Sequence, residues 1–281
     1  MENTENSFLD IPNPRKEVEA LNPYSAPLEG RRDLLRLDFN ENTIGPSPIV
    51  FQALKEISRD EISIYPEYSG LKEKVVETLI KQNPRINTTS SQVGIFNGVD
   101  AALNAIFHAY GNFNDIMLTT SPTFGYYTPC AQMRGMKINS IPYEVKDFQY
   151  PFKKICEFIE RNNPKIVLIC NPNNPTGTRL SPEKIIEITK LSSKTLVVID
   201  ELYEAFTGDS VLPLVDLQKT PNLVVLRSLS KTAGLAGLRI GFAIGNSKVI
   251  NIINRVTGPY DVNSFAVIAA FAALTAKLLT S

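Results

Sequence analysis

Four clusters of polar residues could do chemistry, and each of them follows a short run of aliphatic and β-branched residues. The clusters are residues 97–100 (Asn-Gly-Val-Asp), 171–177 (Asn-Pro-Asn-Asn-Pro-Thr-Gly), 200–203 (Asp-Glu-Leu-Tyr) and 228–231 (Ser-Leu-Ser-Lys). The aliphatic runs are typical of strands buried on both faces, and ligands of parallel sheets collect at the carboxyl ends of such strands. We therefore expect the four clusters to meet at one edge of a sheet.

The last cluster has the composition of an anion site that also holds an amine. Ser228 and Ser230 supply hydroxyls, Lys231 supplies the amine, and Arg239 follows eight residues after the lysine. Guanidinium and hydroxyl donors suit a phosphate group. The turn at Gly98 leads into a helix whose first backbone N–H groups could face the same anion. Alone, each of these features is more often an ordinary basic loop or turn.

Asp200 lies at the tip of a buried strand, where a carboxylate is costly unless a cation meets it. On its own this aspartate would be interpreted as the cap of the next helix, and residues 171–177 as an exposed turn. A phosphate site, a lysine, a strand-tip acid and an amide-rich turn together are the groups that bind pyridoxal phosphate. The lysine holds this cofactor covalently, and the aspartate partners its pyridinium nitrogen.

The elements that must position these clusters alternate along the chain. Strand-like runs are found at residues 93–96, 116–119, 166–169, 196–199, 223–226 and 240–244. Helical periodicity or helix length is found at residues 49–57, 71–80, 101–110, 151–161, 182–191 and 263–279. This alternation predicts an α/β protein, a three-layer αβα sandwich around a mostly parallel sheet.

The pattern also divides the chain. Residues 1–45 are rich in proline, asparagine and charge, which favours an N-terminal arm or part of a small domain. Residues 46–260 carry the alternating pattern and form the predicted large, cofactor-binding domain. Residues 261–281 predict the start of a helix that leads into a small C-terminal domain, most of which we expect this chain to lack.

Composition excludes several classes of function. The 281 residues include 29 Lys and Arg and 29 Asp and Glu, so neither sign of charge favours nucleic acid or a membrane surface. The single histidine, His108, cannot build a histidine triad or a multi-histidine zinc site, and no metal is expected. The three cysteines are widely spaced, and the acidic N-terminus is unlike a signal peptide. We expect a cytoplasmic protein without a nucleic-acid or membrane partner.

The order of these motifs resembles that of the fold-type-I (class I/II) pyridoxal-phosphate aminotransferases, and within them the histidinol-phosphate aminotransferases most of all. The resemblance runs from about Tyr24 to the end of the chain. It includes the last three clusters and residues 234–239 (Gly-Leu-Ala-Gly-Leu-Arg), 40–42 (Asn-Glu-Asn), 45–48 (Gly-Pro-Ser-Pro), 65–66 (Tyr-Pro) and 258–264 (Gly-Pro-Tyr-Asp-Val-Asn-Ser).

The resemblance implies a role for each matching residue. Lys231 would hold the cofactor and shuttle the substrate proton, and Asp200 would keep the pyridine nitrogen protonated. Tyr203 and Asn174 would hydrogen-bond the phenolic oxygen of the ring, and Phe124 would stack on its face. The phosphate would be held by Ser228, Ser230, Arg239 and the backbone of Val99 and Asp100.

Three further residues follow from the resemblance. Tyr65 would reach the phosphate from a second subunit, which implies a homodimer, and Tyr24 and Asn42 would line the substrate pocket. The family has a glutamate where Ala101 stands here. The rest of the family's small domain carries an arginine that grips the substrate. We therefore expect this chain to bind the cofactor, to turn substrate over poorly, and to leave apolar surface uncovered at Val267, Ile268 and Phe271.

The activity that the resemblance implies is transfer of an amino group from a small-molecule donor to a 2-oxo acid. Histidinol phosphate and 2-oxoglutarate are the expected pair, in histidine biosynthesis. Three alternatives stay open: a decarboxylase of a phosphorylated amino acid, a truncated relative that binds the cofactor without turnover, and a plain nucleotide-binding module. The absence of GxGxxG and GxxxxGK[ST] disfavours the last of these.

Overall fold

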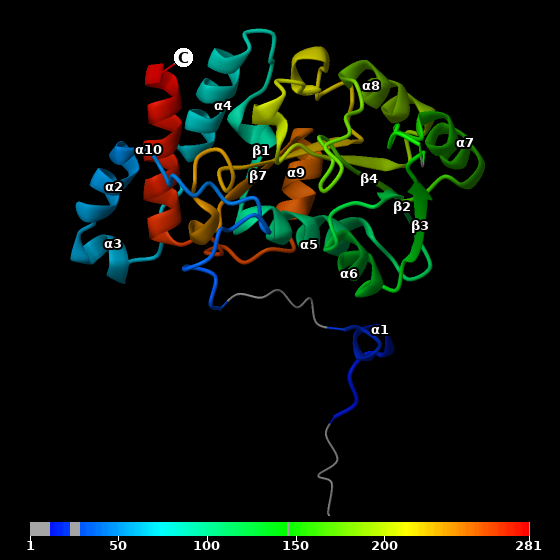
Figure 1. Ribbon diagram of the computed structural model, residues 1–281, viewed down its shortest axis with the longest axis horizontal. Coiled ribbons are helices and arrows are strands. Elements are labelled where there is room, and N and C mark those ends of the chain that lie inside the picture. The colour runs from blue at the N-terminus through cyan, green and yellow to red at the C-terminus, as the bar shows by residue number, and fades with distance from the viewer. Residues whose placement is uncertain (1–11, 23–28, 145, 281) are drawn as a thin grey trace, which may run out of the picture.

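A seven-stranded sheet forms the centre of the chain (Figure 1). In this computed structural model, which describes residues 12–22, 29–144 and 146–280, the strand order is β1-β7-β6-β5-β4-β2-β3. The strands are β1 (Val93–Phe96), β2 (Ile116–Ser121), β3 (Lys137–Pro142), β4 (Ile166–Cys170), β5 (Leu196–Asp200), β6 (Leu223–Ser228) and β7 (Gly241–Gly245). β7 runs antiparallel to both of its neighbours, β1 and β6, and the other described pairs are parallel, so the predicted mostly parallel sheet is confirmed.

Helices connect the strands. They are α1 (Lys16–Glu19), α2 (Pro48–Lys55), α3 (Arg59–Ser63), α4 (Leu71–Gln82), α5 (Gly98–Tyr110), α6 (Tyr127–Gln132), α7 (Phe152–Asn162), α8 (Pro182–Leu191), α9 (Ser247–Asn254) and α10 (Ser264–Thr280). Local sequence explains where several begin. The Ser181 side chain caps α8 and Pro182 occupies its first turn, as the sequence predicts. None of the described helices is both long and apolar enough to cross a membrane.

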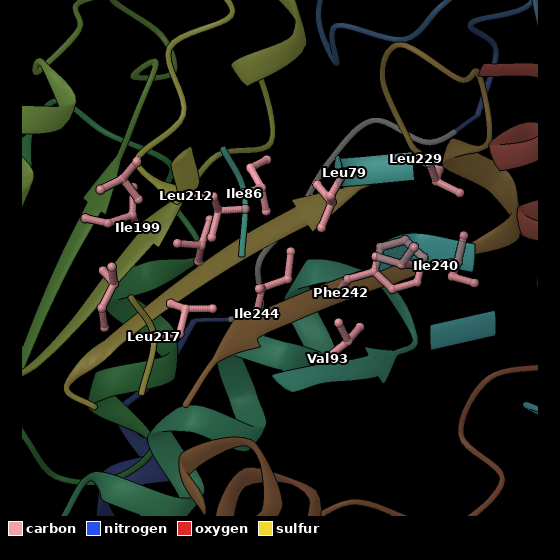
Figure 2. Close-up of a cluster of buried hydrophobic side chains, with 14 of the residues drawn as sticks. Leu79, Ile86, Val93, Ile199, Leu212, Leu217, Leu229, Ile240, Phe242 and Ile244 are labelled. Carbon is pink, nitrogen blue, oxygen red and sulfur yellow. The ribbon is translucent and has the colours of Figure 1, made fainter. Parts of the chain in front are cut away.

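The core has one layer on each face of the sheet because successive strand residues point to opposite sides. In β5, Val197 and Ile199 join a cluster formed with α2, α4, α7, α8 and α10, part of which Figure 2 shows. Leu196 and Val198 join a second cluster formed with α5, α6 and α9. The predicted three-layer αβα sandwich is therefore confirmed.

The elements differ from the sequence-based expectation in a few places. β3 and the short helices α1, α3, α6 and α9 were not predicted, and α5 begins at Gly98 rather than at residue 101. The expected exposure of Val267 is wrong. Val267 is only 5% exposed because α10, the helix that holds it, packs beside α2 and α4 (Figure 1).

Candidate active site

Strand register brings the predicted clusters to one edge of the sheet. Cys170 at the end of β4 lies opposite Asp200 at the end of β5, and Asp200 lies opposite Leu226 of β6. Ser228 at the end of β6 pairs with Gly241, the first residue of the antiparallel strand β7. The loop that enters β7 therefore starts and ends at the same edge as the other clusters.

A cavity of about 690 Å³ opens at this edge. It is lined by the segments that follow β1, β2, β4, β5 and β6, together with residues 38–41 of the N-terminal segment. Ten of the predicted site residues line it: Val99, Asp100, Phe124, Asn174, Asp200, Tyr203, Ser228, Ser230, Lys231 and Arg239. Residues far apart in the sequence thus form one site.

One end of the cavity is rich in donors for an anion. Gly98 has a left-handed φ of 79°, and a Cβ atom there would lie 2.7 Å from the Arg239 guanidinium. Only a glycine allows this close approach without a shift of the arginine. Arg239 Nη2 lies 2.8 Å from an Asp100 carboxylate oxygen, and Ser228 Oγ lies 2.8 Å from Ser230 Oγ. The hydroxyls, the guanidinium and the helix N-terminus that were predicted to hold a phosphate therefore lie together.

The other end holds the buried carboxylate of Asp200, which is 2% exposed. The Tyr127 hydroxyl donates a hydrogen bond to it at 2.7 Å, and the Leu202 backbone N–H donates another at 3.1 Å. Burial raises the pKa of Asp200 from 3.8 to about 6, while these hydrogen bonds oppose the rise. Among the described residues it forms no ion pair, so a cation brought into the cavity would stabilise its ionised form.

Lys231 lies between the two ends. Its Nζ donates a hydrogen bond to the Phe39 carbonyl at 2.6 Å and lies 5.9 Å from the centroid of the Tyr203 ring. Burial lowers the pKa of Lys231, which increases the fraction of neutral, nucleophilic amine. The Tyr203 hydroxyl accepts a hydrogen bond from the Asn40 side chain at 3.1 Å, and burial raises its pKa, so it stays protonated.

The asparagines of residues 171–177 have different roles. Asn171 exchanges hydrogen bonds with the backbone of Leu180, and Asn173 donates to the Pro122 carbonyl. These two side chains hold the turn, whereas Asn174 lines the cavity. Phe124 also lines it and packs edge-on against Tyr127, with ring centroids 5.4 Å apart.

Three predicted residues are not brought into this cavity. Asn42 donates instead to the Thr232 carbonyl at 3.2 Å, beside the lysine loop. Tyr65 is 69% exposed and stacks on Tyr260, with ring centroids 4.1 Å apart, in a groove beside α10. Tyr24 lies outside the described residues.

Some cavity residues were missed by the sequence analysis. Tyr127 and the carbonyl of Phe39 contact Asp200 and Lys231 directly, and Thr123 and Cys170 also line the cavity. Tyr127 gave no clear signal, because its helix, α6, holds Thr128, Pro129 and Gln132 and was not predicted; its need for a hydrogen-bond partner follows only from its burial. Backbone carbonyls such as that of Phe39 carry no sequence signal.

The arrangement can bind a ligand with an anionic end and a cationic end, and it presents an amine that can attack a carbonyl carbon. In the part of the chain that the structure describes, no group of three or more His, Cys, Asp or Glu residues is placed to hold a metal ion.

Residues 32–281 match the family model of the class I and II aminotransferases. The chain belongs to this aminotransferase family. Histidinol-phosphate aminotransferases are among its relatives. The one from Caldanaerobacter subterraneus is 32% identical over 254 residues, which are 90% of this chain and 69% of the relative. The one from Roseiflexus castenholzii is 34% identical over 274 residues, or 92% of this chain and 71% of the relative.

Solved structures of aminotransferases share the fold. The histidinol-phosphate aminotransferase from Sinorhizobium meliloti, determined in complex with pyridoxal-5'-phosphate, superposes with a TM-score of 0.83 at 23% identity. The match covers 96% of this chain and 72% of that one. The sheet and its helices are therefore the aminotransferase fold.

Proposed function

We propose that this aminotransferase uses pyridoxal phosphate to move an amino group from histidinol phosphate to 2-oxoglutarate. The observation that carries the proposal is the cavity itself. An anion cradle, a buried carboxylate without a cationic partner among the described residues, and an amine with a lowered pKa line one space of about 690 Å³. The family membership supplies the reaction class.

The residues present fit this cofactor at both ends. Ser228, Ser230, Arg239 and the first backbone N–H groups of α5 would hold its phosphate, and the missing Cβ of Gly98 leaves room for the Arg239 guanidinium beside them. Asp200 would accept a hydrogen bond from the protonated ring nitrogen, which would restore the charge that burial disfavours. When bound, pyridoxal phosphate supplies a carbonyl for amines and an electron sink.

Side chains of this protein would attach the cofactor, transfer the substrate proton and orient the ring. Lys231 Nζ would attach the cofactor covalently and then carry the proton that leaves and returns to the substrate α-carbon. Tyr203 and Asn174 would hydrogen-bond the phenolic oxygen of the ring, and Phe124 would pack against the ring face. The Phe39 carbonyl accepts a hydrogen bond from Nζ and so helps to orient the amine.

The substrate pair is supported by the relatives. Curated proteins that are 32% and 34% identical over about nine-tenths of this chain are histidinol-phosphate aminotransferases. A substrate-binding role for Asn42 and Tyr24 stays part of this proposal; Asn42 lies beside the lysine loop, next to the cavity rather than in its lining.

The quaternary arrangement and the location of the protein belong to the same proposal. Tyr65 lies outside the cavity of its own chain and is 69% exposed, which suits a residue that reaches the phosphate site of a second copy. Each site would then be complete only in a homodimer. The proposal also places the protein in the cytoplasm.

The proposal is tested by titrating the chain with pyridoxal phosphate while following visible absorbance, then reducing with borohydride and mapping the labelled peptide. We expect the pyridoxyl group on Lys231, and no covalent label in Lys231→Ala. Turnover with histidinol phosphate and 2-oxoglutarate is then compared with turnover of aspartate as donor. A label on a different lysine, or a preference for aspartate, would contradict the assignment.

A further inference from the structure

The glutamate of the Asp-Glu-Leu-Tyr cluster has no role in the mechanism above, yet Glu201 is fully buried at the end of β5 beside Asp200. Its carboxylate faces away from the cavity and lies 2.9 Å from Nη2 of Arg227, the residue before Ser228. We infer that Glu201 and Arg227 are positioning residues that fix Asp200, Tyr203 and Ser228 relative to one another. The inference rests on the proposed function.

The contacts of Glu201 tie it to two elements. One carboxylate oxygen accepts a hydrogen bond from Ser210 Oγ at 2.8 Å, and the other accepts one from the Val211 backbone N–H at 2.9 Å. Its own N–H donates to the Leu226 carbonyl at 3.0 Å. Every oxygen of the carboxylate is therefore engaged, and the side chain has a single arrangement.

Arg227 extends the network to a third segment. Its Nη2 also donates to Ser210 Oγ at 2.8 Å, and its Nη1 pairs with the carboxylate of Glu204. Glu204 begins a short 3-10 turn immediately after Tyr203. The Arg227 guanidinium thus contacts Glu201 and Glu204, which follow Asp200 and Tyr203 in the chain, and Arg227 itself precedes Ser228.

Strand geometry explains why the neighbours matter. Asp200 bonds with Tyr127 on the α6 side of the sheet, whereas Glu201 bonds with Val211 on the opposite side. Adjacent strand residues point to opposite faces, so a bond that fixes Glu201 also fixes the direction of Asp200. The same alternation relates Arg227 to Ser228 on β6.

The ring nitrogen and the phosphate of the cofactor are joined through one ring and a short arm, so the tips of β5 and β6 must keep their separation within a narrow range. The planar guanidinium of Arg227 directs Nη2 to Glu201 and Nη1 to Glu204, so this buried ion pair is geometrically specific. It is a poor source of stability, because burying both charges costs about as much as their attraction returns. The Arg227 Nε is buried and has no partner among the described residues, which adds to that cost. The pair is therefore better explained by geometry than by stability.

The test compares cofactor binding by the full-length wild type, Glu201→Gln and Arg227→Lys. Glutamine keeps the acceptor for Val211 but loses the charge, and lysine keeps the charge but cannot reach Glu201 and Glu204 together. Visible absorbance is titrated with pyridoxal phosphate and then followed against pH. We expect an affinity loss of about tenfold or more and a shifted pH midpoint of the bound-cofactor spectrum in both variants.

The matched control is Asn222→Ala. Asn222 donates to the carbonyls of Thr189, Ser192 and Thr195 at the end of the sheet away from the cavity, so its loss weakens the same strands without touching the site. We expect it to lower the melting temperature while leaving the affinity within about twofold and the pH midpoint unchanged. Arg227→Lys carries the test alone if Glu201→Gln does not fold.

Two outcomes would overturn the inference while leaving the proposed function intact. One is an unchanged affinity and spectrum in both variants; the other is an equal affinity loss in Asn222→Ala at a similar melting temperature. A wild-type chain that gives no cofactor spectrum would instead refute the proposed function, and the inference with it.

Discussion

Asp200 is the residue whose ionisation depends most on what occupies the cavity. Its pKa in the folded chain, about 6, lies above the ordinary value of 3.8 because the side chain is buried. Well below pH 3.8 the group is protonated in both folded and unfolded chains. As pH rises from 4 through 6, the unfolded chain releases the proton first, so stability falls across that window.

Asp200→Asn removes this penalty, because asparagine does not ionise. Without cofactor, we expect the variant to melt at the same temperature as wild type at pH 4 and at a higher temperature at pH 7, with a gain of at most about 3 kcal/mol. With pyridoxal phosphate, we expect the order to reverse, since the ring nitrogen loses its anionic partner. Thermal melts from pH 4 to pH 8, with and without cofactor, check both parts. A wild type as stable as the variant at pH 7 would contradict the first.

Tyr127 donates the shorter of the two hydrogen bonds to that carboxylate. In Tyr127→Phe we expect a stability loss of about 1–2 kcal/mol, a further rise in the pKa of Asp200 and weaker cofactor binding. Tyr143→Phe is the control, because the Tyr143 hydroxyl is buried but bonds to Thr120 rather than to a cavity residue. Equal cofactor affinities for the two variants would remove Tyr127 from the site.

Single residues were predictable where their chemistry was visible in the sequence. Asp200 and Lys231 come at or just after the ends of buried parallel strands, and Arg239 enters the same cavity just before the antiparallel strand β7. Tyr127 and the Phe39 carbonyl were not predictable in this way. Tyr127 reaches Asp200 across 73 positions of the chain and Phe39 reaches Lys231 across 192, so their contacts depend on the finished fold.

Among the elements, the start of α5 has the sharpest requirement. Gly98 combines a left-handed φ with contact to Arg239. In Gly98→Ala we expect a backbone cost of about 1–2 kcal/mol and a displaced guanidinium. Pyridoxal phosphate should then bind at least about tenfold more weakly, while pyridoxal, which has no phosphate, should bind nearly as before.

Gly177→Ala is the matched control for this prediction. Gly177 also has a left-handed φ, of 68°, but nothing lies within 4 Å of an added Cβ. It therefore reproduces the backbone strain without the clash. Equal losses of affinity in the two variants, or an equal loss for pyridoxal, would contradict a phosphate cradle at α5.

Elements were predictable in proportion to their burial. The six predicted strands are near-continuous aliphatic runs, and each is found within two residues of its expected bounds. β3 was missed because this edge strand carries polar residues such as Lys137 and Ser140, whereas β1 at the opposite edge keeps an apolar run. Pro129 within α6 likewise disguises a short helix.

On the scale of the whole molecule, the exposed position of Tyr65 leads to a complementation experiment. Chains carrying Tyr65→Ala and chains carrying Lys231→Ala are each expected to be impaired. Mixed after reversible dissociation, half of the dimers would be hybrids with one complete site, so activity should return to about a quarter of wild type. No gain over the separate variants would show that Tyr65 does not act across the dimer.

β7 closes the segment that carries the lysine and the arginine, because Ser228 and Gly241 pair at its base. Midway along this segment of residues 228–241, Gly234 packs tightly on Gly45, so that a Cβ atom on Gly234 would lie 2.7 Å from the Gly45 carbonyl carbon. A loop that is held in place at both ends and at its middle loses most of its conformational entropy when the chain folds. An incoming ligand then has little disorder left to suppress, and its affinity reflects contacts rather than the ordering of a flexible chain.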